Sequence, residues 1–541
     1  MTDIHTPVLI AGGSLVGLTT SVLLASRGTP NLVVERHHGT AIHPRAAMLH
    51  QRTTEIFREL GLGETVSKAA ELEFVQNGAI MAAEALGGKE LHYFQTNVNE
   101  GVDHLSPEPR LFITQIGLEP ILRDTAKSLG AASMFGTELV SFEEQADGVR
   151  SIIRNRDTGE EQVVYSTYLI AADGSHSTVR DRLGINMLGH GSFANCITIY
   201  FKADIDALIG ERNLSVVYIN RPDMLGFFRY SIKRDGGFLV VFSALDENGE
   251  KIPDVSASAD TEQCIRYVRT ALGAGDDLPI EIESVQRWEA AARWAESYGA
   301  GRVFIIGDAA HEMPPTGGFG GNTGIVDAHN LAWKMAYVLK GKAGEGLLRS
   351  YEPERRQAAQ MTAEQAYTRY VLRVDQSLGT EGLDETLDDI SIELGPVYAS
   401  DAVVGSEPSP TPVTQSAREP GAHLGARAPH LWVTRDGSRI STLDLFGGDF
   451  VLLTGADGQG WVDAAAQAPG VTVHRVGPGG DVVAGVGEFE TAYGISPTGA
   501  VLVRPDGVVA WRTDAIPADP ASAVSNALAQ ILARAAVPTS A

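Results

Sequence analysis

The chain has 541 residues, is 43% hydrophobic and carries 43 Lys and Arg against 68 Asp and Glu. That length suits about three domains, and the composition is that of a globular protein rather than a disordered or fibrous one. The net charge of −25 repels phosphate groups, which argues against nucleic acid or an anionic membrane as the main partner. Two cysteines, Cys196 and Cys264, are too few for a disulfide framework and favour a reducing, cytoplasmic setting.

An uncharged segment near the N-terminus, residues 7–26, approaches the length of a membrane span. No basic stretch precedes it, and Gly12, Gly13 and Gly17 interrupt it where a tight turn is expected. We therefore expect neither a signal peptide nor a transmembrane helix in this segment.

The same segment has the pattern of a dinucleotide-binding unit. Residues 8–11 are predicted to form a strand, residues 15–27 a helix, and residues 32–35 a strand that ends in Glu35. In such a unit, one glycine allows the turn, another admits the pyrophosphate, a third lets the helix pack on the strand, and the acid binds the ribose hydroxyls. Ser14 replaces the second glycine of the pattern. Glu35, rather than a basic residue, favours a free ribose 2′-hydroxyl.

Three weaker signals follow in the chain. Arg45 lies beyond the predicted adenosine site and is either a solvated loop residue or a basic group that faces the diphosphate or the flavin. A helix is predicted at residues 51–60, and another begins near Gln115. A buried strand at residues 168–172 ends in Asp173-Gly174, which by itself indicates only a tight turn.

Shorter alternating runs occupy residues 195–284, at 197–201, 214–219, 226–232 and 237–244. This pattern predicts an antiparallel sheet in a second, inserted domain. The chain then returns to the first domain, which is therefore discontinuous.

The loop at residues 307–322 joins a predicted strand at 303–306 to a predicted helix at 323–340, and it is rich in glycine and proline. Glycine there makes sense if a ligand approaches the backbone closely. A helix that starts just after the loop directs free N–H groups and its positive end at that ligand. An isoalloxazine ring, which is anionic when reduced, suits this position. The alternative is an ordinary connector between a strand and a helix.

The remainder contains a predicted helix at 351–374, a proline-rich linker at 405–429 and a last α/β unit. Its strands are expected at 450–453, 471–476, 501–503 and 508–511, with a hairpin turn at Pro505-Asp506-Gly507 and a helix at 521–536. This unit lacks Cys-x-x-Cys and cannot perform thioredoxin chemistry. His311-Glu312 begins like the zinc motif H-E-x-x-H, but Pro315 ends the match, and we expect no metal site.

Together, the glycine turn with Glu35, the Asp173-Gly174 pair and the Gly307-Asp308 pair resemble the motifs of single-component FAD-dependent aromatic hydroxylases (class A flavoprotein monooxygenases). The C-terminal unit looks like the thioredoxin-like tail of the phenol, resorcinol and polyketide hydroxylases. Over nearly its whole length, the chain is similar to polyketide hydroxylases of the aklavinone hydroxylase kind.

The resemblance implies an α/β fold with three domains. A doubly wound FAD-binding domain would comprise residues 1–70, 108–184 and 286–400. An inserted substrate domain, built on an antiparallel sheet, would comprise residues 71–107 and 185–285. Residues 401–429 would be the linker and residues 430–541 the thioredoxin-like domain.

The resemblance also implies a set of site residues. The cofactor-binding positions are Gly12, Ser14 and Gly17 at the diphosphate, Glu35 with Arg36 at the adenosine ribose, Arg45 and Gln115 along the FAD, Asp308 at the ribityl chain, and Asp173 for FAD and nicotinamide use. The catalytic positions are Arg45, Pro314 and the backbone N–H groups at the flavin edge, from Gly318, Gly320, Gly321 and Asn322. Tyr218 and Arg373 would contact substrate; their alternatives are a core tyrosine and a surface arginine.

The implied function is hydroxylation of a polycyclic aromatic polyketide or a similar phenol, with NADPH or NADH and O2, through a flavin C4a-hydroperoxide. The nicotinamide would bind only transiently, because no second dinucleotide pattern follows. One alternative is oxygen insertion of the Baeyer–Villiger type or oxidative rearrangement of a polyketide. Another is a non-catalytic flavin-binding scaffold, which the intact glycine-rich loop disfavours. We expect a small aromatic substrate as partner and a monomer or homodimer.

Overall fold

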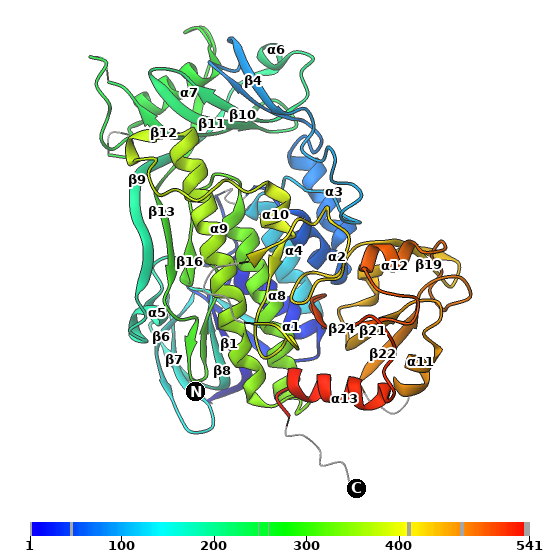
Figure 1. The fold of residues 1–541 in the computed structure, drawn as a ribbon. Helices are drawn as coiled ribbons and strands as arrows, with labels where there is room; N and C mark the ends of the chain where they lie inside the picture. The colour runs from blue at the N-terminus through cyan, green and yellow to red at the C-terminus, as the bar shows by residue number, and fades with distance from the viewer. Residues whose placement is uncertain are drawn as a thin grey trace.

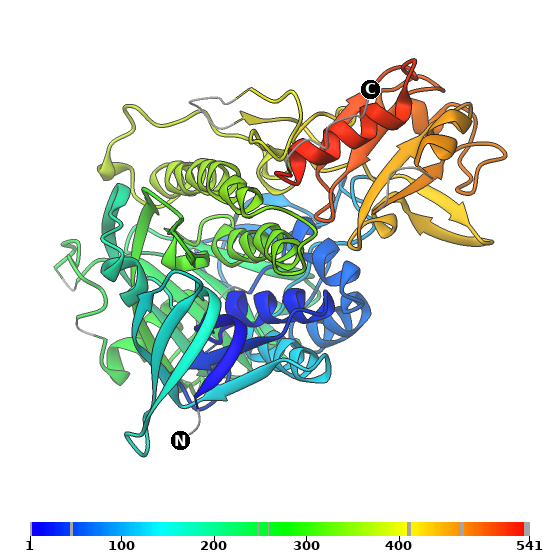
Figure 2. The same ribbon diagram turned by 90° about the horizontal axis from the view of Figure 1, so that it is seen from below.

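The computed structural model describes residues 3–43, 47–246, 248–257, 259–407, 413–465 and 470–534. It is built on two eight-stranded sheets and a four-stranded sheet near the C-terminus. Figure 1 shows the second large sheet above the first, and the C-terminal unit as a separate lobe beside helix α8. Seen from below in Figure 2, the C-terminal lobe again lies to one side of the large helices.

The first sheet forms around the predicted N-terminal strand, which pairs in parallel with its neighbours β2 and β8. The paired segments at residues 8–11, 32–34 and 168–171 are apolar and buried, because both faces of a parallel sheet are covered. The strands are β1 (Ile4–Ala11), β2 (Asn31–Glu35), β5 (Ala132–Phe135), β6 (Thr137–Glu144), β7 (Val149–Asn155), β8 (Glu161–Ala171), β14 (Gly299–Ala300) and β15 (Val303–Ile305). The main helices of this part are α1 (Leu15–Ser26), α2 (Gln51–Glu59), α3 (Gly63–Glu73), α4 (Gln115–Ser128), α5 (Thr178–Arg182), α8 (Phe319–Leu339), α9 (Tyr351–Arg373) and α10 (Asp389–Glu393).

The second sheet is largely antiparallel, as predicted, with one departure: β3 and β10 pair in parallel. The departure arises because β3 and β4 come from an earlier part of the chain, outside the alternating runs. The strands are β3 (Ala79–Ala83), β4 (Glu90–Gln95), β9 (Met187–Lys202), β10 (Leu214–Asn220), β11 (Met224–Tyr230), β12 (Gly236–Ala244), β13 (Glu281–Ala295) and β16 (His311–Glu312).

The two faces of the second sheet have different partners. One face packs on helix α7 (Thr261–Leu272) through aliphatic side chains. The other face is aromatic, and it packs against α9 and against residues 47–48. We call it the aromatic face. Its aromatic members and neighbours are Phe74, Phe112, Phe193, Tyr200, Tyr218, Phe227, Phe238, Phe242, Trp288 and Tyr370.

Helix α8 begins at Phe319, four residues before the predicted start, so this prediction was wrong at the N-terminus. Glycines 320 and 321 are poor helix formers, which misplaced the boundary. Gly318 occupies the N-cap with a φ of 69°, and the Phe319 side chain that follows is buried and anchors the first turn. Gly320 and Gly321 therefore lie in the first helical turn, which Gly318 directly precedes.

The C-terminal lobe contains the predicted hairpin, because β23 and β24 are antiparallel on either side of Pro505-Asp506-Gly507. Its sheet has the order β22-β21-β23-β24, with β21 parallel to β22 and antiparallel to β23. The elements are β19 (Trp432–Arg435), β20 (Ser438–Ser441), β21 (Phe450–Thr454), α11 (Gln459–Ala465), β22 (Val471–Arg475), α12 (Glu488–Tyr493), β23 (Ala500–Val503), β24 (Val509–Thr513) and α13 (Pro520–Ile531).

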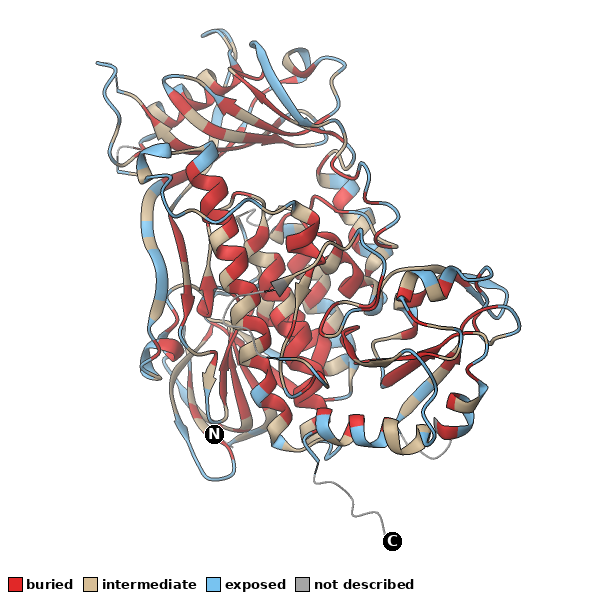
Figure 3. Ribbon diagram, viewed as in Figure 1, coloured by how far each residue is buried: buried red, intermediate tan, exposed pale blue. Residues whose placement is uncertain are grey.

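Four buried charges join this lobe to the large helices. Lys334 of α8 and Arg504 of the hairpin both contact the Glu354 carboxylate, at 2.8 and 2.7 Å. Arg504 also pairs with Asp506 at 2.5 Å. All four residues are at most 2% exposed. Figure 3 shows that the long helices in the middle of the molecule are largely buried. The two acids and two bases balance, so neither unit can separate without exposing unpaired charge.

Removing one member of this cluster should destabilise the whole chain. Arg504→Ala leaves Glu354 and Asp506 without their shared cation in a buried site, and such a loss costs about 3–5 kcal/mol. We expect the midpoint of guanidinium unfolding, followed by tryptophan fluorescence, to fall accordingly. Arg512→Ala, at a partly exposed arginine on strand β24 that pairs with the exposed Asp514, is the control and should change the midpoint little. An equal fall in the unfolding midpoint for both variants would contradict the proposed contribution of this cluster to stability.

Candidate active site

The three sequence motifs meet at the ends of strands β1, β8 and β15. Gly12 has a φ of 104°, and a Cβ on it would collide with the carbonyl oxygen of Ala172, just before Asp173. A Cβ on Gly17 would collide with the carbonyl oxygen of Gly12. A Cβ on Gly307 would lie 3.1 Å from the side chain of Val16 in the first turn of α1. These glycines are therefore required by close approach within the protein itself, before any ligand binds.

Glu35 and Ser14 are held at the same turn. The Glu35 carboxylate accepts hydrogen bonds from the backbone N–H groups of Gly13 at 2.7 Å and His37 at 2.8 Å. The Ser14 hydroxyl donates to Glu119 of α4 at 2.5 Å, and the Gln115 amide lies 3.5 Å from that hydroxyl. The serine that replaces a glycine thus ties the turn to α4. Arg36 is exposed next to Glu35, and Arg45 lies outside the described residues.

The two aspartates of the motifs differ in environment. Asp173 follows β8; one carboxylate oxygen accepts from the Val179 N–H at 3.2 Å, and the other is buried without a partner among the described residues. Burial raises the pKa of Asp173, against the hydrogen bonds from Ser177 and Val179. Asp308 follows β15 and is exposed. A buried acceptor with no partner and an exposed carboxylate at neighbouring strand ends form a polar edge suited to a ligand with hydroxyl groups.

The first turn of α8 supplies free donors, but fewer than the sequence suggested. The N–H of Gly318 donates to the Pro315 carbonyl at 2.9 Å, so it is not free. Asn322 is the fourth helical residue, where the N–H joins the helical ladder. The N–H groups of residues 319–321 lack helical partners, and no side chain caps the helix. Pro314 is buried in the preceding loop.

Asn322 acts through its side chain instead. Its amide oxygen accepts from the His50 N–H at 2.9 Å and from the Thr53 hydroxyl at 2.7 Å. Its amide nitrogen donates to the Met48 carbonyl at 2.9 Å. Asn322 therefore fastens residues 48–53 to the start of α8, which sequence reasoning had not indicated.

A buried aspartate fixes the loop from behind, and sequence reasoning missed it. Asp327 of α8 accepts from the Gly307 N–H at 3.1 Å and contacts the His311 ring nitrogen at 2.6 Å. It also accepts from the Arg355 guanidinium at 2.8 Å. Burial raises the pKa of Asp327, but the neighbouring His311 and Arg355 outweigh it, so the pKa is lowered. The one sequence feature that could have indicated Asp327 is the presence of an acid within the apolar run predicted to form a helix.

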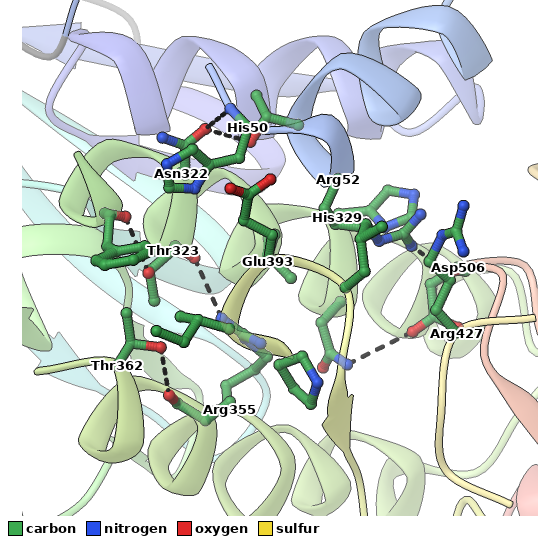
Figure 4. A pocket seen from close by; sticks show the side chains of 18 of the residues that line it. His50, Arg52, Asn322, Thr323, His329, Arg355, Thr362, Glu393, Arg427 and Asp506 are labelled. Atoms are coloured by element: carbon green, nitrogen blue, oxygen red, sulfur yellow. Dashed lines mark hydrogen bonds between the residues drawn. The ribbon is translucent and has the colours of Figure 1, made fainter. Parts of the chain in front are cut away.

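A pocket lies behind the first turn of α8 and extends to the C-terminal lobe, with Asn322 and His50 at one end and Asp506 and Arg427 at the other (Figure 4). Its charged groups already have partners in the protein. Arg355 pairs with Asp327, Glu393 with Arg110, Asp506 with Arg504, and Arg427 with Glu55. We therefore expect the residues that line this pocket to hold α8 in place rather than to bind a ligand.

The two candidate substrate residues come together at the aromatic face. The ring of Phe94 on β4 lies 5.7 Å from the Tyr218 ring, nearly perpendicular to it. The Arg373 guanidinium, at the end of α9, lies 6.0 Å from the same Phe94 ring. Tyr218 is partly buried and Arg373 is exposed. Phe94, itself 46% exposed, links them and was not predicted.

Two family models match the chain: a FAD binding domain over residues 5–366 and the C-terminal domain of aromatic-ring hydroxylases over residues 421–535. The first covers more than half of the sequence. The chain belongs to the FAD-dependent aromatic-ring hydroxylases. As a member of this family it is an enzyme, a flavin-dependent monooxygenase that uses FAD, NAD(P)H and O2.

Individual aromatic-ring hydroxylases are similar over their full length. A 4-methyl-5-nitrocatechol 5-monooxygenase of Burkholderia sp. is 44% identical, covering 98% of each chain. A tetracenomycin B2 monooxygenase-dioxygenase of Streptomyces olivaceus is 38% identical, covering 99% of this chain and all of the other. The crystal structure of aklavinone-11 hydroxylase with FAD and aklavinone superposes with a TM-score of 0.90 at 35% identity, covering 99% of this chain and 100% of that one. Among the described residues, no helix is long and apolar enough to span a membrane.

The residues of this hydroxylase fit FAD on three observations. Neither α1 nor α8 has a side-chain hydrogen bond at its N-cap, so backbone N–H groups of the first turns could donate to an electron-rich ligand. Within the described part of the chain, one buried oxygen of Asp173 has no partner. The space beside Gly320 is open: a Cβ there would meet only the Met313 side chain, at 3.7 Å.

The open space at Gly320 yields a test. Gly320→Val should change the melting temperature of the FAD-free protein little, because the one described atom within 4 Å of a new Cβ belongs to the Met313 side chain, at an ordinary contact distance of 3.7 Å. A flavin ring against this turn would be displaced, and a misplacement of about 1 Å can cost about 10²-fold in rate. We expect slower NADPH oxidation and more hydrogen peroxide per product. The control is Gly448→Val, at a glycine of the C-terminal lobe with open surroundings. A destabilised but fully coupled Gly320→Val enzyme would contradict the placement of the ring.

Proposed function

We propose that this monooxygenase hydroxylates a polycyclic aromatic polyketide of the phenol or quinone type. The observation that carries the proposal is the aromatic face, which is lined with rings and adjoins residues 47–50 beside the first turn of α8. Flat aromatic substrates gain binding energy from such rings. Full-length similarity to hydroxylases and monooxygenases named for aklavinone and tetracenomycin supports the same substrate class.

We infer the following division of work. Residues 1–70, 108–184 and 286–400 bind FAD, residues 71–107 and 185–285 form the wall for substrate, and the C-terminal unit, which we interpret as thioredoxin-like, supports α8. When bound, FAD would supply the redox chemistry of the reaction, with NAD(P)H as the reductant and O2 as the oxidant. The proposed cofactor contacts are Gly12, Ser14, Gly17, Glu35, Arg36, Arg45, Gln115, Asp173 and Asp308.

The chain's own part in the reaction is positioning and electrostatics. The free N–H groups of residues 319–321 would stabilise negative charge on the flavin edge. Tyr218 and Arg373 would hold a phenolic oxygen of the substrate. The rings around them would exclude water, which strengthens each of these interactions.

A second candidate substrate is a single-ring nitrocatechol, favoured by the 44% identity to a nitrocatechol monooxygenase. Oxygen insertion or rearrangement remains an alternative outcome of the same oxidation. Hydroxylation and simple oxygen insertion both add one oxygen atom, so the product structure distinguishes them. We also propose a cytoplasmic enzyme, monomeric or homodimeric; two free, buried cysteines are consistent with a reducing compartment.

A substrate panel tests the proposal. We expect polycyclic hydroxyquinones to stimulate NADPH oxidation by the FAD-loaded protein and to yield a product heavier by one oxygen atom, with little hydrogen peroxide. Single-ring nitrocatechols should be poorer substrates. A clear preference for nitrocatechols would select the second candidate. Failure of every compound to stimulate NADPH oxidation, with FAD bound, would contradict the proposed substrate class.

A further inference from the structure

A buried arginine, Arg229 of β11, lies on the aromatic face. It follows Phe227 by two residues, so both side chains point to the same side of the sheet, as does Tyr218, the partner of Phe227 on β10. Its guanidinium carbon lies 4.2 Å from the centroid of the Phe112 ring and 5.3 Å from that of Phe74. The residue is only 6% exposed. A charged guanidinium group is therefore buried among the aromatic side chains of this face.

The charge of Arg229 is not compensated within the described part of the chain. Its one hydrogen bond there is a donation to the carbonyl of Ala47, and its Nε is buried without a partner. No carboxylate of the described residues lies within ion-pair distance. The negative charge of Glu73 acts on Arg229. The Glu73 carboxylate, however, already accepts a hydrogen bond from the Thr114 N–H at 2.8 Å. Burial lowers the pKa of Arg229 to about 9, so the fold bears the cost of a dehydrated cation.

The surroundings indicate where a compensating anion would lie. The positive charges of Arg229 and Arg373 both act on the Tyr218 hydroxyl, from β11 and from the end of α9. The negative charge of Asp389 also reaches that hydroxyl, but Asp389 is paired with Arg369 at 3.0 Å. Burial raises the pKa of Tyr218, against the two arginines, so the tyrosine stays a neutral donor. The region next to Tyr218 therefore has two cations and a hydroxyl donor, surrounded by rings.

We propose that Arg229 is a specificity-determining residue that binds an anionic oxygen on the aromatic ring of the substrate, a phenolate, and so selects the ionised phenol. This inference rests on the proposed function. A charge-assisted hydrogen bond from the guanidinium satisfies the buried cation. The phenol proton leaves to solvent on binding, and the remaining phenolate donates more electron density to the ring carbon that receives oxygen. A neutral ring without an acidic hydroxyl would leave Arg229 unpaired and is disfavoured for that reason.

The competing explanation is that Arg229 only holds the Ala47 carbonyl and the adjoining segment. The two roles predict different results for a ligand whose ionisation is visible. 4-Nitrocatechol is such a probe, because its phenolate absorbs at longer wavelength than its neutral form. Titration into the oxidised, FAD-loaded protein at several pH values gives both the affinity and the pH at which the bound ligand ionises.

We expect wild type to bind the probe as the phenolate and to lower its ionisation pH by at least one unit. Arg229→Gln should weaken binding of the ionised probe about 10–100-fold, the weight of a lost hydrogen bond to a charged group, and return the ionisation pH toward that of free probe. Arg234→Gln, at a partly exposed arginine of the β11–β12 turn paired with Asp206, is the matched control and should behave as wild type. FAD content and melting temperature are measured for each variant.

Three results would overturn the inference: wild type that does not bind the probe, wild type that binds it neutral, or Arg229→Gln that binds the phenolate as tightly as wild type. If Arg229→Gln does not retain FAD, Arg229→Lys decides, since it keeps the charge but not the planar donor geometry. The lysine variant should keep a lowered ionisation pH at reduced affinity, and complete loss of the shift with FAD bound would contradict the electrostatic role. These binding measurements need no turnover. Normal phenolate binding with no polyketide hydroxylation would refute the proposed function alone.

Discussion

The conformation of the glycine-rich loop at residues 307–322 depends on one buried carboxylate. Asp327 is fully buried, and it binds the backbone at the end of β15, the His311 ring and the Arg355 guanidinium. Arg355 in turn contacts the Tyr398 hydroxyl at 2.7 Å and the Thr323 carbonyl at 3.2 Å. The loop that carries Asp308 and the glycines is therefore fixed to both α8 and α9. A loop with so many glycines needs such a support to hold one conformation.

The segment of residues 47–50 connects the two large sheets at the same place. On one side, the carbonyl of Ala47 accepts from Arg229 of the second sheet. On the other, Met48 and His50 are bound by Asn322 in the first turns of α8. A ligand that moves Arg229 therefore acts on a segment that adjoins the expected flavin edge. This arrangement gives a physical route by which a phenolate on the aromatic face and a flavin at α8 can influence each other.

The sequence indicated the elements whose signal is local. The β1 turn with Glu35, the strand before Asp173 and the two long helices follow from glycine placement and apolar periodicity, and the structure contains them. The start of α8 was misplaced because glycine propensity argued against helix where tertiary packing of Phe319 decides for it. Glu119, Asp327 and Arg229 could not be assigned because their partners are distant in sequence, and a single charged residue in a helix or strand pattern usually lies at the surface. Likewise, the donation of Gly318 to Pro315 depends on the exact turn, which sequence does not specify.

We propose that bound FAD would have the N1–C2=O edge of its ring against the first turn of α8. A crystal structure of the reduced, FAD-loaded enzyme tests it most directly. We expect flavin N1 or the C2 oxygen within about 3.2 Å of at least one backbone nitrogen of residues 319–321. We also expect the contacts of Asp327 behind the loop to be unchanged. A flavin whose N1–C2=O edge faces away from α8, with those N–H groups bound only to water, would contradict this placement of the ring.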